Sequence, residues 1–416
     1  MKKLRNQKSI LYVHYGENWL RGSEIVLLDL LNMAIENHYQ PILWCNSEVL
    51  AEEAKMAGVE VIVDDFVCLG YWIMPRWRFC QFFRQIFKAT RLMKKFKVSV
   101  VHSNNGAPCQ WLAIACKLAE TPLLLHLHAR YLYRDRLTLL FHGADKIVGV
   151  SQSVIDVFNV DECNHQHTEV IYNGINPSRV LSPCPIDLRT KVNANDNDFV
   201  LLFIGSLISR KSVDSVIRAI ANLRYKHAIK LAIFGDGSEK EQLMKLCENL
   251  KLENIIYFFP ETADVAKIYS SNADCFISTP VEEVFGLTLA EASIAKLPVI
   301  TCDVAGVNEI FTNNENAILI PAKNLTALEQ AIEQVIMRPE ITKKLLENAY
   351  RHIVTNFNCQ KQFAQFDYLY RQLQSVTSTQ GLLVSMSTQV KQVLAAIWSK
   401  TSSKLTLSLH WKQDHE

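Results

Sequence analysis

Short apolar runs alternate with amphipathic stretches along most of the chain, and the alternation falls into two series. The expected strands of the first series are Ile10–Val13, Pro41–Trp44, Val98–His102, Leu123–His128 and Lys146–Val150. Those of the second are Val200–Ile204, Lys230–Phe234, Ile255–Phe259, Cys275–Ser278, Val299–Cys302 and Ala317–Ile320. Helical patterns such as Val213–Leu223 and Glu239–Cys247 separate the strands. Nearly continuous apolar strands joined by helices are typical of parallel sheets covered on both faces.

A polar segment rich in Asn, Asp and Pro, from about residue 173 to 197, separates the two series. The length of 416 residues and the apolar content of 49% allow each half to bury a core of its own. We therefore predict an α/β protein with two doubly wound, Rossmann-like domains. Ligands of such folds bind at the carboxyl ends of the strands, and a cleft between two domains is the natural place for them.

The residues with the clearest chemistry lie just after the expected strand that ends at Ser278. A loop carries Glu282 and Glu283, a helix follows, and Glu291 lies one to two turns inside it. Four backbone N–H groups at the start of this helix are free to bind an anion, those of Phe285, Gly286, Leu287 and Thr288. Carboxylates near such a phosphate site suit the hydroxyls of a sugar or a ribose, which donate hydrogen bonds to charged acceptors.

The spacing of these glutamates resembles the motif of a known family. Glu283 and Glu291, with Phe285-Gly286-Leu287 between them, resemble the Glu-x7-Glu motif of glycosyltransferase family 4. The following Pro298-Val299-Ile300 and Gly306-Val307-Asn308-Glu309-Ile310 are similar to that family's PVIATDVGGVPEI run, with asparagine where proline is usual. The resemblance extends over about residues 10–375.

A segment upstream of this motif extends the resemblance. Phe203–Asp214 resembles the family's GRLVPEKGVD segment, which places Lys211 at a lysine that neutralises the donor diphosphate. Ser206 stands where the family often has an arginine, so Arg210 is the candidate replacement for that cation.

Two segments of the first half are also similar to the family. Gly22-Ser23-Glu24 resembles the GGAE turn, so that Gly22 is a candidate contact to the donor diphosphate. Pro122–His128 resembles the PVVYTVH strand, which places the family's cleft histidine at His128.

The resemblance implies the GT-B fold, in which two Rossmann-like domains face each other across a cleft. It implies an acceptor-side domain over residues 1–185, a nucleotide-sugar-binding domain over 186–357 and a closing helix over 358–375 that packs back on the first domain. Residues 376–416 have no counterpart. Val390–Trp398 has helical apolar spacing, and this extension is either amphipathic or disordered.

The function that the resemblance implies is retaining transfer of a sugar from a UDP- or GDP-linked donor to a saccharide or lipid-linked acceptor, in cell-surface polysaccharide or glycolipid synthesis. The implied catalytic residues are His128, Lys211 and Glu283. The implied donor-binding residues are Gly22, Ser206, Arg210, Lys211, Phe285, Gly286, Leu287, Thr288 and Glu291. Neither a metal nor another cofactor is expected, because the cations and the helix start suit the leaving diphosphate.

Several alternatives stay open at this point. His126 and His128 lie two apart on one strand and share a face, which also suits a metal pair. Asp196-Asn197-Asp198 has the Asp-x-Asp spacing of a divalent-cation site, although it lies in polar turn material. For the function, the alternatives are a nucleotide-sugar epimerase on the same fold and a catalytically inactive nucleotide-sugar-binding subunit.

The net charge of +2 argues against nucleic acid as a partner, but it conceals an uneven distribution. From Phe66 to Ala119 there are nine basic residues and no acidic one, so the rest of the chain has a net charge of −7. One side of the expected helix in this stretch is apolar and carries Phe79, Phe82, Phe83, Ile86, Phe87 and Met93. The opposite side carries Arg84, Lys88, Arg91 and Lys95. Either the apolar side packs in the domain core, or residues 72–97, with Trp72 and Trp77, contact an anionic membrane surface.

The eleven cysteines are scattered singly without a Cys-x-x-Cys pair, which favours a reducing compartment. The basic start of the chain is followed by only a short apolar run, and no stretch reaches the roughly 18 apolar residues of a spanning helix. We expect a cytoplasmic protein, with a peripheral position on the inner face of the membrane left open.

Overall fold

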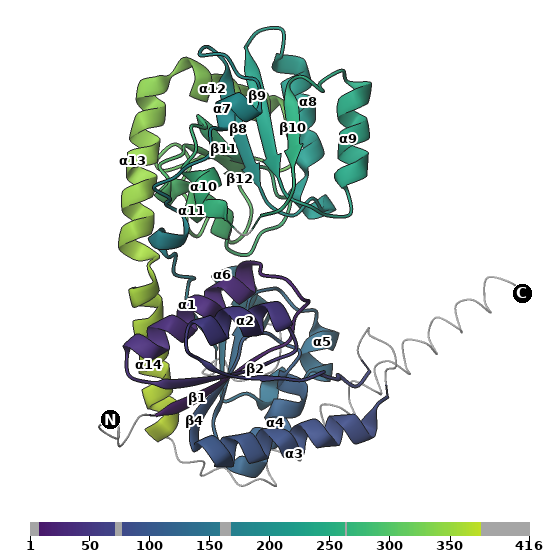
Figure 1. Ribbon diagram of the computed structural model, residues 1–416, viewed down its shortest axis with the longest axis vertical. Coiled ribbons are helices and arrows are strands. Elements are labelled where there is room, and N and C mark those ends of the chain that lie inside the picture. Colours follow the sequence, from purple (N-terminus) through teal and green to yellow (C-terminus); the bar gives the residue numbers. More distant parts are fainter. Residues whose placement is uncertain (1–7, 71–76, 159–167, 263, 376–416) are drawn as a thin grey trace, which may run out of the picture. The chain divides into compact units, whose positions relative to one another are not determined.

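The computed structural model describes residues 8–70, 77–158, 168–262 and 264–375. These residues form two compact units (Figure 1). The first contains the described residues up to Ile171 together with those from Phe363 onward, and the second contains Tyr172–Gln362. Trp72 and the extension 376–416 lie outside the described residues.

The first unit is built on a seven-stranded sheet in which every pair of neighbouring strands is parallel, in the order β3-β2-β1-β4-β5-β6-β7. The strands are β1 (Ser9–His14), β2 (Gln40–Cys45), β3 (Glu60–Val63), β4 (Val98–Ser103), β5 (Leu123–Leu127), β6 (Lys146–Gly149) and β7 (Thr168–Val170). All residues of β1 and β5 are buried, as expected for central strands of a sheet that is covered on both faces.

Helices cover both faces of this sheet (Figure 1). They are α1 (Gly22–Glu36), α2 (Glu48–Met56), α3 (Phe79–Phe96), α4 (Cys109–Ala119), α5 (Tyr133–Thr138), α6 (Gln152–Ile155), α14 (Cys359–Ser375) and the 3-10 turns η1 (Phe141–Gly143) and η2 (Asp156–Phe158). Helix α1 packs beside α2, and α3 packs along α4 on the opposite face.

The second unit has a six-stranded parallel sheet in the order β10-β9-β8-β11-β12-β13. The strands are β8 (Phe199–Ile204), β9 (Ile229–Phe234), β10 (Ile256–Phe259), β11 (Cys275–Ser278), β12 (Val299–Cys302) and β13 (Ile318–Ile320). The helices are η4 (Pro177–Arg179), α7 (Leu188–Lys191), η5 (Ser209–Lys211), α8 (Val213–Leu223), α9 (Lys240–Asn249), α10 (Val265–Tyr269), α11 (Leu287–Ile294), α12 (Leu325–Met337) and α13 (Pro339–Asn356).

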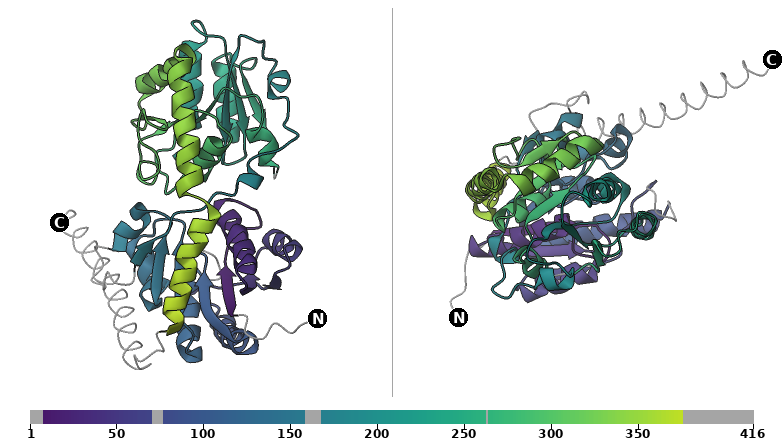
Figure 2. Two further views of the ribbon diagram at one scale, coloured as in Figure 1. Left: turned by 90° about the vertical axis from the view of Figure 1, so that its left-hand side faces the viewer. Right: turned by 90° about the horizontal axis from the view of Figure 1, so that it is seen from above.

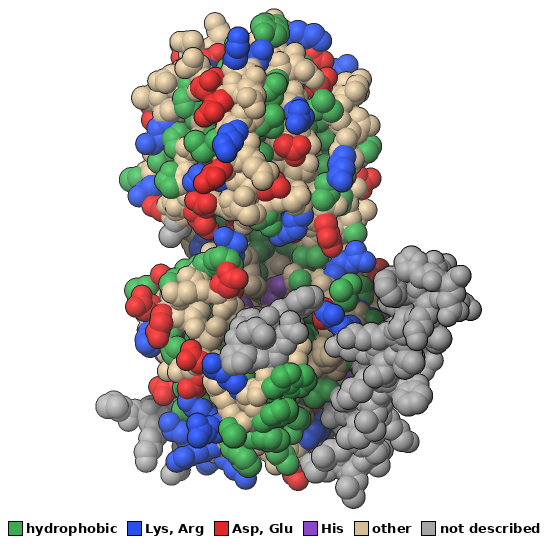
Figure 3. Space-filling view, turned by 90° about the vertical axis from the view of Figure 1, so that its right-hand side faces the viewer, with side chains coloured by type: hydrophobic (Ala, Val, Ile, Leu, Met, Phe, Trp, Pro, Cys, Tyr) green, Lys and Arg blue, Asp and Glu red, His purple; other side chains and the backbone are tan. Residues whose placement is uncertain are grey.

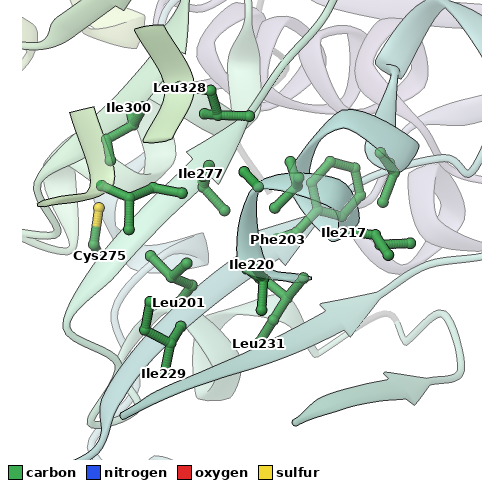
Figure 4. Close-up of a cluster of buried hydrophobic side chains, with 14 of the residues drawn as sticks. Leu201, Phe203, Ile217, Ile220, Ile229, Leu231, Cys275, Ile277, Ile300 and Leu328 are labelled. Atoms are coloured by element: carbon green, nitrogen blue, oxygen red, sulfur yellow. The ribbon is translucent and has the colours of Figure 1, made fainter. Parts of the chain in front are cut away.

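The core of the second unit lies between this sheet and α8, α9 and α12. Leu201 and Phe203 of β8 pack there with Ile217 and Ile220 of α8 and Leu328 of α12 (Figure 4). The α8 side chains repeat at positions 213, 216, 217 and 220, which is the spacing of one helical face, and each of them is buried. The helical spacing of apolar residues in the sequence therefore predicts which side chains of α8 are buried in this core.

These two parallel sheets confirm the predicted α/β architecture of two Rossmann-like domains. The eleven expected strands are all present, but β3 and β7 were missing from the prediction. Both are short edge strands, and most of their residues are only half-buried, so that neither shows the continuous apolar run of a central strand.

The polar segment after Ile171 packs on the second unit. The backbone N–H of Ile175 donates to the carbonyl of Phe357 at 2.8 Å, and the N–H of Ile186 donates to the carbonyl of Lys267 at 3.2 Å. By packing, the second unit therefore starts well before the domain boundary expected at residue 185.

The last described helix, α14, lies against the sheet of the first unit beside α1 (Figure 2). The hydroxyl of Tyr370 lies 3.2 Å from the hydroxyl of Tyr12 on β1 and 2.7 Å from Nδ1 of His102 on β4. All three side chains are fully buried, and Phe366 packs on the ring of His102. Helix α14 thus completes the face of the sheet that α1 begins.

In the part of the chain that the structure describes, no helix has both the length and the apolar character needed to cross a bilayer. The cysteines of that part are all free.

Removing the Tyr370 hydroxyl should destabilise the first unit. In Tyr370→Phe, the ring of His102 and the hydroxyl of Tyr12 lose a buried partner, which costs about 1–3 kcal/mol. We expect a lower urea midpoint for this variant, whereas Tyr368→Phe, on the exposed side of the same helix, should unfold like the wild type. Equal midpoints for the two variants would show that the hydroxyl contributes nothing.

Candidate active site

Glu283 lies at the centre of a cluster of charges in the second unit. Its carboxylate oxygen Oε2 accepts a hydrogen bond from Nζ of Lys211 at 2.5 Å, and Nη1 of Arg210 lies 3.6 Å from the same oxygen. The side chains of Lys211 and Glu283 are each only 11% exposed. The structure therefore brings together three of the predicted site residues in a cluster with one net positive charge.

Two loops hold this cluster in place. The backbone N–H of Val281 donates to the carbonyl of Arg210 at 2.8 Å, and the hydroxyl of Thr279 donates to the carbonyl of Ser212 at 2.9 Å. Because β8 and β11 are neighbours in a parallel sheet, the loops that follow them meet at the same edge. The contact between these two loops places Lys211 beside the carboxylate of Glu283.

The Glu283 carboxyl remains ionised in spite of its burial. Burial raises its pKa, but the charge and hydrogen bond of Lys211, the charge of Arg210 and the N–H of Val284 lower it by more. The pKa of Glu283 therefore lies below its ordinary value. The carboxylate can accept hydrogen bonds at neutral pH, and it cannot serve there as a proton donor.

The start of α11 is the second element of this site. Gly286 precedes the helix with a φ of +87°, a conformation that favours glycine. Within the described residues, the backbone N–H groups of Phe285 to Thr288 donate to no other group of the protein. Four backbone N–H groups therefore remain unpaired within the described structure at the helix start where the sequence predicts an anion site.

Phe285 fixes this start through its side chain. Its ring is 2% exposed and lies 6.0 Å from the ring of Phe357 and 6.5 Å from that of Tyr172. The buried ring of Phe285 is therefore not available to a ligand, and only its backbone could contact one. The loop after β12 supports the same region, because a Cβ at Gly306 would lie 2.4 Å from the carbonyl carbon of Val284.

Glu291 does not join the Glu283 cluster. Its Oε2 accepts a hydrogen bond from the hydroxyl of Tyr269 at 3.0 Å, and its Oε1 lies 3.7 Å from Nη2 of Arg179. Tyr269 is buried and Glu291 nearly so. The carboxylate is therefore held in one orientation by two groups on different elements, α10 and η4.

The first unit holds a separate group of polar side chains at the carboxyl ends of β1, β4 and β5. Nε2 of His14 lies 2.8 Å from Oε1 of Glu24, the third residue of α1. Asn104, just after β4, lies 3.2 Å from Nδ1 of His14 and 3.2 Å from Nε2 of His128. His14, Glu24 and Asn104 are all buried, and His128 is partly exposed.

Hydrogen-bond chemistry assigns the ring nitrogens of this group. The amide of Asn104 donates to the carbonyl of Ser23 at 3.0 Å, so its NH2 end faces Ser23 and His14, and its oxygen faces His128. His14 consequently carries its proton on Nε2 and donates it to Glu24. His128 carries its proton on Nε2 as well, and its Nδ1 is the acceptor.

Burial keeps His128 neutral. It lowers the pKa of His128 well below 6.5, and the neighbouring His126 lowers it further. The pKa of Glu24 is also below its ordinary value: burial raises it, but the hydrogen bond and charge of His14 outweigh that effect.

Two other predicted site residues stand near these groups along the chain. Ser206 follows β8, four residues before Arg210, and forms no hydrogen bond within the described structure. Gly22 is the first residue of α1. Arg21, which stands before it, places its guanidinium 3.7 Å from the centre of the Trp19 ring.

The residues of the two alternative metal sites, His126 with His128 and Asp196 with Asp198, lie in local arrangements that need no metal ion. His126 packs between the rings of His102, His128 and Phe366, and within the described structure its nitrogens bond to nothing. Oδ2 of Asp198 accepts the backbone N–H of Asn195 at 2.7 Å and closes a turn. Among the residues that the structure describes, no three His, Cys, Asp or Glu side chains are arranged to hold a metal ion.

Five residues of the first-unit polar group and of the contacts around Glu291 are not predicted from the sequence. They are His14, Glu24, Asn104, Arg179 and Tyr269. Polar residues at the ends of otherwise apolar strands were a signal for His14 and Asn104. Arg179 and Tyr269 show no such signal, because their relation to Glu291 depends on how η4 and α10 pack.

Comparison with known proteins identifies the family of this chain. Residues 20–179 match the family described as Glycosyltransferase Family 4, and residues 186–352 match the family described as Glycosyl transferases group 1. The chain belongs to the group 1 and family 4 glycosyltransferases, a class of transferase enzymes. The predicted family is thereby confirmed.

Among curated proteins, an uncharacterized glycosyltransferase of Methanocaldococcus jannaschii is 28% identical over 51% of this chain and 56% of its own. An alpha-monoglucosyldiacylglycerol synthase of Streptococcus pneumoniae is 24% identical over 66% of this chain and 68% of its own. The chain spans about half the length of the first curated relatives that it matches.

Among solved structures, Anabaena HepE in complex with UDP and glucose superimposes with a TM-score of 0.76 and 20% identity, over 88% of this chain and all of that one. At this identity the likeness establishes the fold. It confirms the GT-B architecture of two Rossmann-like domains.

The buried histidines make the stability of the protein sensitive to acid. Burial lowers the pKa of His102 to about 3 and those of His126 and His128 well below 6.5. The folded state is not penalised by these groups above pH 6.5, because the same histidines are also neutral in the unfolded chain there. Stability is lost as the pH falls toward the folded values. For His102 we expect a loss of about 1.4 kcal/mol per unit between pH 6 and 5, and His126 and His128 add to the loss in the same direction.

Urea unfolding at pH 7.5, 6.0 and 5.0 checks this expectation. His126→Leu should reduce the pH slope, since it removes one of the three groups and the coupling of that ring to its neighbours. His38→Asn, at an exposed position, is the matched control and should keep the full slope. A flat profile in the wild type, or an unchanged slope in His126→Leu, would contradict the linkage.

Proposed function

We propose that the protein is a retaining glycosyltransferase that moves a sugar from a nucleoside-diphosphate donor to a saccharide or lipid-linked acceptor. The observation that carries this proposal is the pairing of Lys211 and Arg210 with Glu283 beside the free N–H groups of α11. Two cations and a helix start next to an ionised carboxylate suit a ligand that combines a diphosphate with sugar hydroxyls.

Lys211 and Arg210 would bind the diphosphate. Their charges exceed that of Glu283 by one, so the cluster attracts a further anion, and the N–H groups of Phe285 to Thr288 lie next in the chain to receive it. Arg210 would take the place of the cation that family members often carry at the position of Ser206. Its position supports that role, since its Nη1 donates to the backbone carbonyl of Glu282 at 3.2 Å and so lies near the carboxylate that binds Lys211.

The two glutamates would bind the hydroxyl groups of the donor. Glu291, oriented by Tyr269 and Arg179, would accept hydrogen bonds from the ribose hydroxyls. Glu283 would accept hydrogen bonds from the transferred sugar, in the same way that it accepts the N–H of Val284 now. The depressed pKa of Glu283 keeps it an acceptor throughout the neutral range.

His128 would position the transferred sugar. Asn104 holds its Nε2–H, so Nδ1 is the atom that can accept a sugar hydroxyl. Because His128 is neutral, it would add no charge repulsion to a transition state with a positive anomeric carbon.

In the proposed reaction, the bond between the anomeric carbon and the diphosphate oxygen breaks, and its electron pair leaves with the diphosphate. The acceptor oxygen forms its bond on the same face of the sugar and gives its proton to a donor phosphate oxygen. Lys211, Arg210 and the helix start would stabilise the charge on the leaving group, which is the main task in such a transition state. This route uses no metal ion.

The acceptor and the location are also part of this proposal. The name of the Streptococcus relative describes a glycosylated diacylglycerol, which supports a lipid-linked acceptor. Free cysteines are usual in a reducing compartment, so we place the protein in the cytoplasm, peripherally on the inner face of the membrane.

Lys211→Ala should lower turnover at least about 100-fold, the usual scale for one electrostatic stabiliser of a transition state. The measurement is the release of UDP, GDP or ADP from a panel of sugar nucleotides with candidate acceptors. Lys240→Ala, which removes a partly exposed lysine paired with Asp236, is the control and should keep full turnover. Near-normal turnover in Lys211→Ala would remove this residue from the mechanism, and an isomerised sugar from donor alone would favour an epimerase.

Arg210 and Ser206 offer a sharper test of the same site. Arg210→Ala should lower turnover by about 10- to 100-fold, because one of two cations is lost. If Arg210 replaces a cation at position 206, then Ser206→Arg should restore much of that activity in the double variant. Arg218→Ala is the matched control on the exposed side of α8. Full activity in Arg210→Ala, or no gain from Ser206→Arg, would count against the replacement.

A further inference from the structure

Helix α3 presents two apolar faces, although the sequence predicts one. Phe82, Ile86, Ala89 and Met93 are buried against the first unit. Three other aromatic side chains of the helix point outward, together with a tryptophan just before it. This aromatic stripe consists of Trp77, Phe79, Phe83 and Phe87, which are 64%, 51%, 53% and 68% exposed.

The aromatic stripe is a continuous feature of the surface. Phe79, Phe83 and Phe87 are spaced by four residues and therefore follow one side of the helix. The ring of Trp77 stacks on that of Phe79 at 5.8 Å. Figure 3 shows hydrophobic side chains gathered in one patch on this unit, with Lys and Arg side chains nearby. An exposed apolar patch of this kind marks a site of interaction.

Positive charge borders the stripe. The exposed basic residues of this stretch are Arg78, Arg84, Arg91, Lys94, Lys95 and Lys97. In the described part of the chain, none of them has a carboxylate within 4 Å, whereas the half-buried Lys88 is paired with Asp64. No acidic residue occurs between Phe66 and Ala119. The positive charge of this surface is therefore not neutralised by nearby carboxylates.

We propose that the aromatic stripe and its basic border dock the protein on an anionic lipid bilayer. Aromatic side chains favour the boundary between head groups and acyl chains, and lysines and arginines attract anionic head groups. The proposal deepens the proposed function. It rests on that function in one respect: a membrane-borne acceptor gives the enzyme a reason to bind a bilayer.

Charge complementarity favours a bilayer over a second copy of the chain as the partner of this surface. In a two-fold dimer through this face, the basic borders of both copies would meet, and like charges would repel. A bilayer instead offers both partners in one plane, an apolar layer for the stripe and a layer of negative charge for the cations. Stable membrane binding usually requires two such signals together.

Vesicle co-sedimentation of the full chain tests this proposal. We expect binding to vesicles of three parts phosphatidylcholine and one part phosphatidylglycerol, and more than 100-fold weaker binding to phosphatidylcholine alone, because all the basic residues of the border then lose their partner. Each lysine or arginine near an anionic surface strengthens binding about fivefold, so Arg84→Gln, Arg91→Gln and Lys94→Gln together should weaken it about 100-fold and reduce its salt dependence. Phe79→Ser, Phe83→Ser and Phe87→Ser together should weaken binding at least tenfold but keep its salt dependence.

Matched controls come from the second unit. Lys245→Gln, Lys343→Gln and Lys344→Gln remove the same charge from exposed positions, and Tyr225→Ser with Met337→Ser removes exposed apolar surface. Both control proteins should bind like the wild type. Equal losses in the control and α3 variants would overturn the proposal, and so would the absence of sedimentation at 50 mM salt or a concentration-dependent dimer that the serine variants abolish.

Sugar-nucleotide turnover with a soluble acceptor separates this proposal from the function. The α3 variants should keep that turnover, since they are remote in sequence from the proposed site residues. Normal turnover without vesicle binding would overturn the docking surface alone. Vesicle binding without any turnover would instead overturn the proposed function.

Discussion

A buried carboxylate must be paired, and the arrangement around Glu283 follows from that constraint. An isolated charge with 11% of its side chain exposed would be neutralised or expelled, so the Lys211 ammonium must lie against it. That contact requires the loop after β8 to meet the loop after β11, which the strand order β9-β8-β11-β12 permits. The same contact also places the start of α11, because this helix begins only four residues after Glu283.

The same rule organises the first unit. Glu24 is buried at the start of α1 and accepts a hydrogen bond from Nε2–H of His14, and Nδ1 of that ring accepts one from the side-chain amide of Asn104. Each polar group at the ends of β1, β4 and β5 thereby satisfies the next one. A sheet whose interior is almost wholly apolar has one polar edge, and both candidate sites lie on such edges.

The sequence predicts the parts of this protein that depend on local pattern. Central strands are recognisable as apolar runs, and α8 as a repeated face, because burial on both sides leaves few alternatives for such segments. The motif around Glu283 and Glu291 was also visible, since spacing along one loop and one helix is local. The pairing of Glu291 with Tyr269 and Arg179 was not, because three separate elements create it. Helix α3 shows the same limit: its periodicity identifies an amphipathic helix, but only the position of α4 decides that Phe82 is covered and Phe83 is not.

The place of α14 in the first unit has a consequence for the order in which the protein is made. The second unit is one continuous segment, whereas the first unit needs Phe366 and Tyr370 to cover the histidines of β4 and β5. During synthesis the first 171 residues leave the ribosome long before these side chains do, so that a face of the first sheet stays open to water. The second unit can complete its core in the meantime, and the half of the protein that is translated first is therefore the half that finishes folding last.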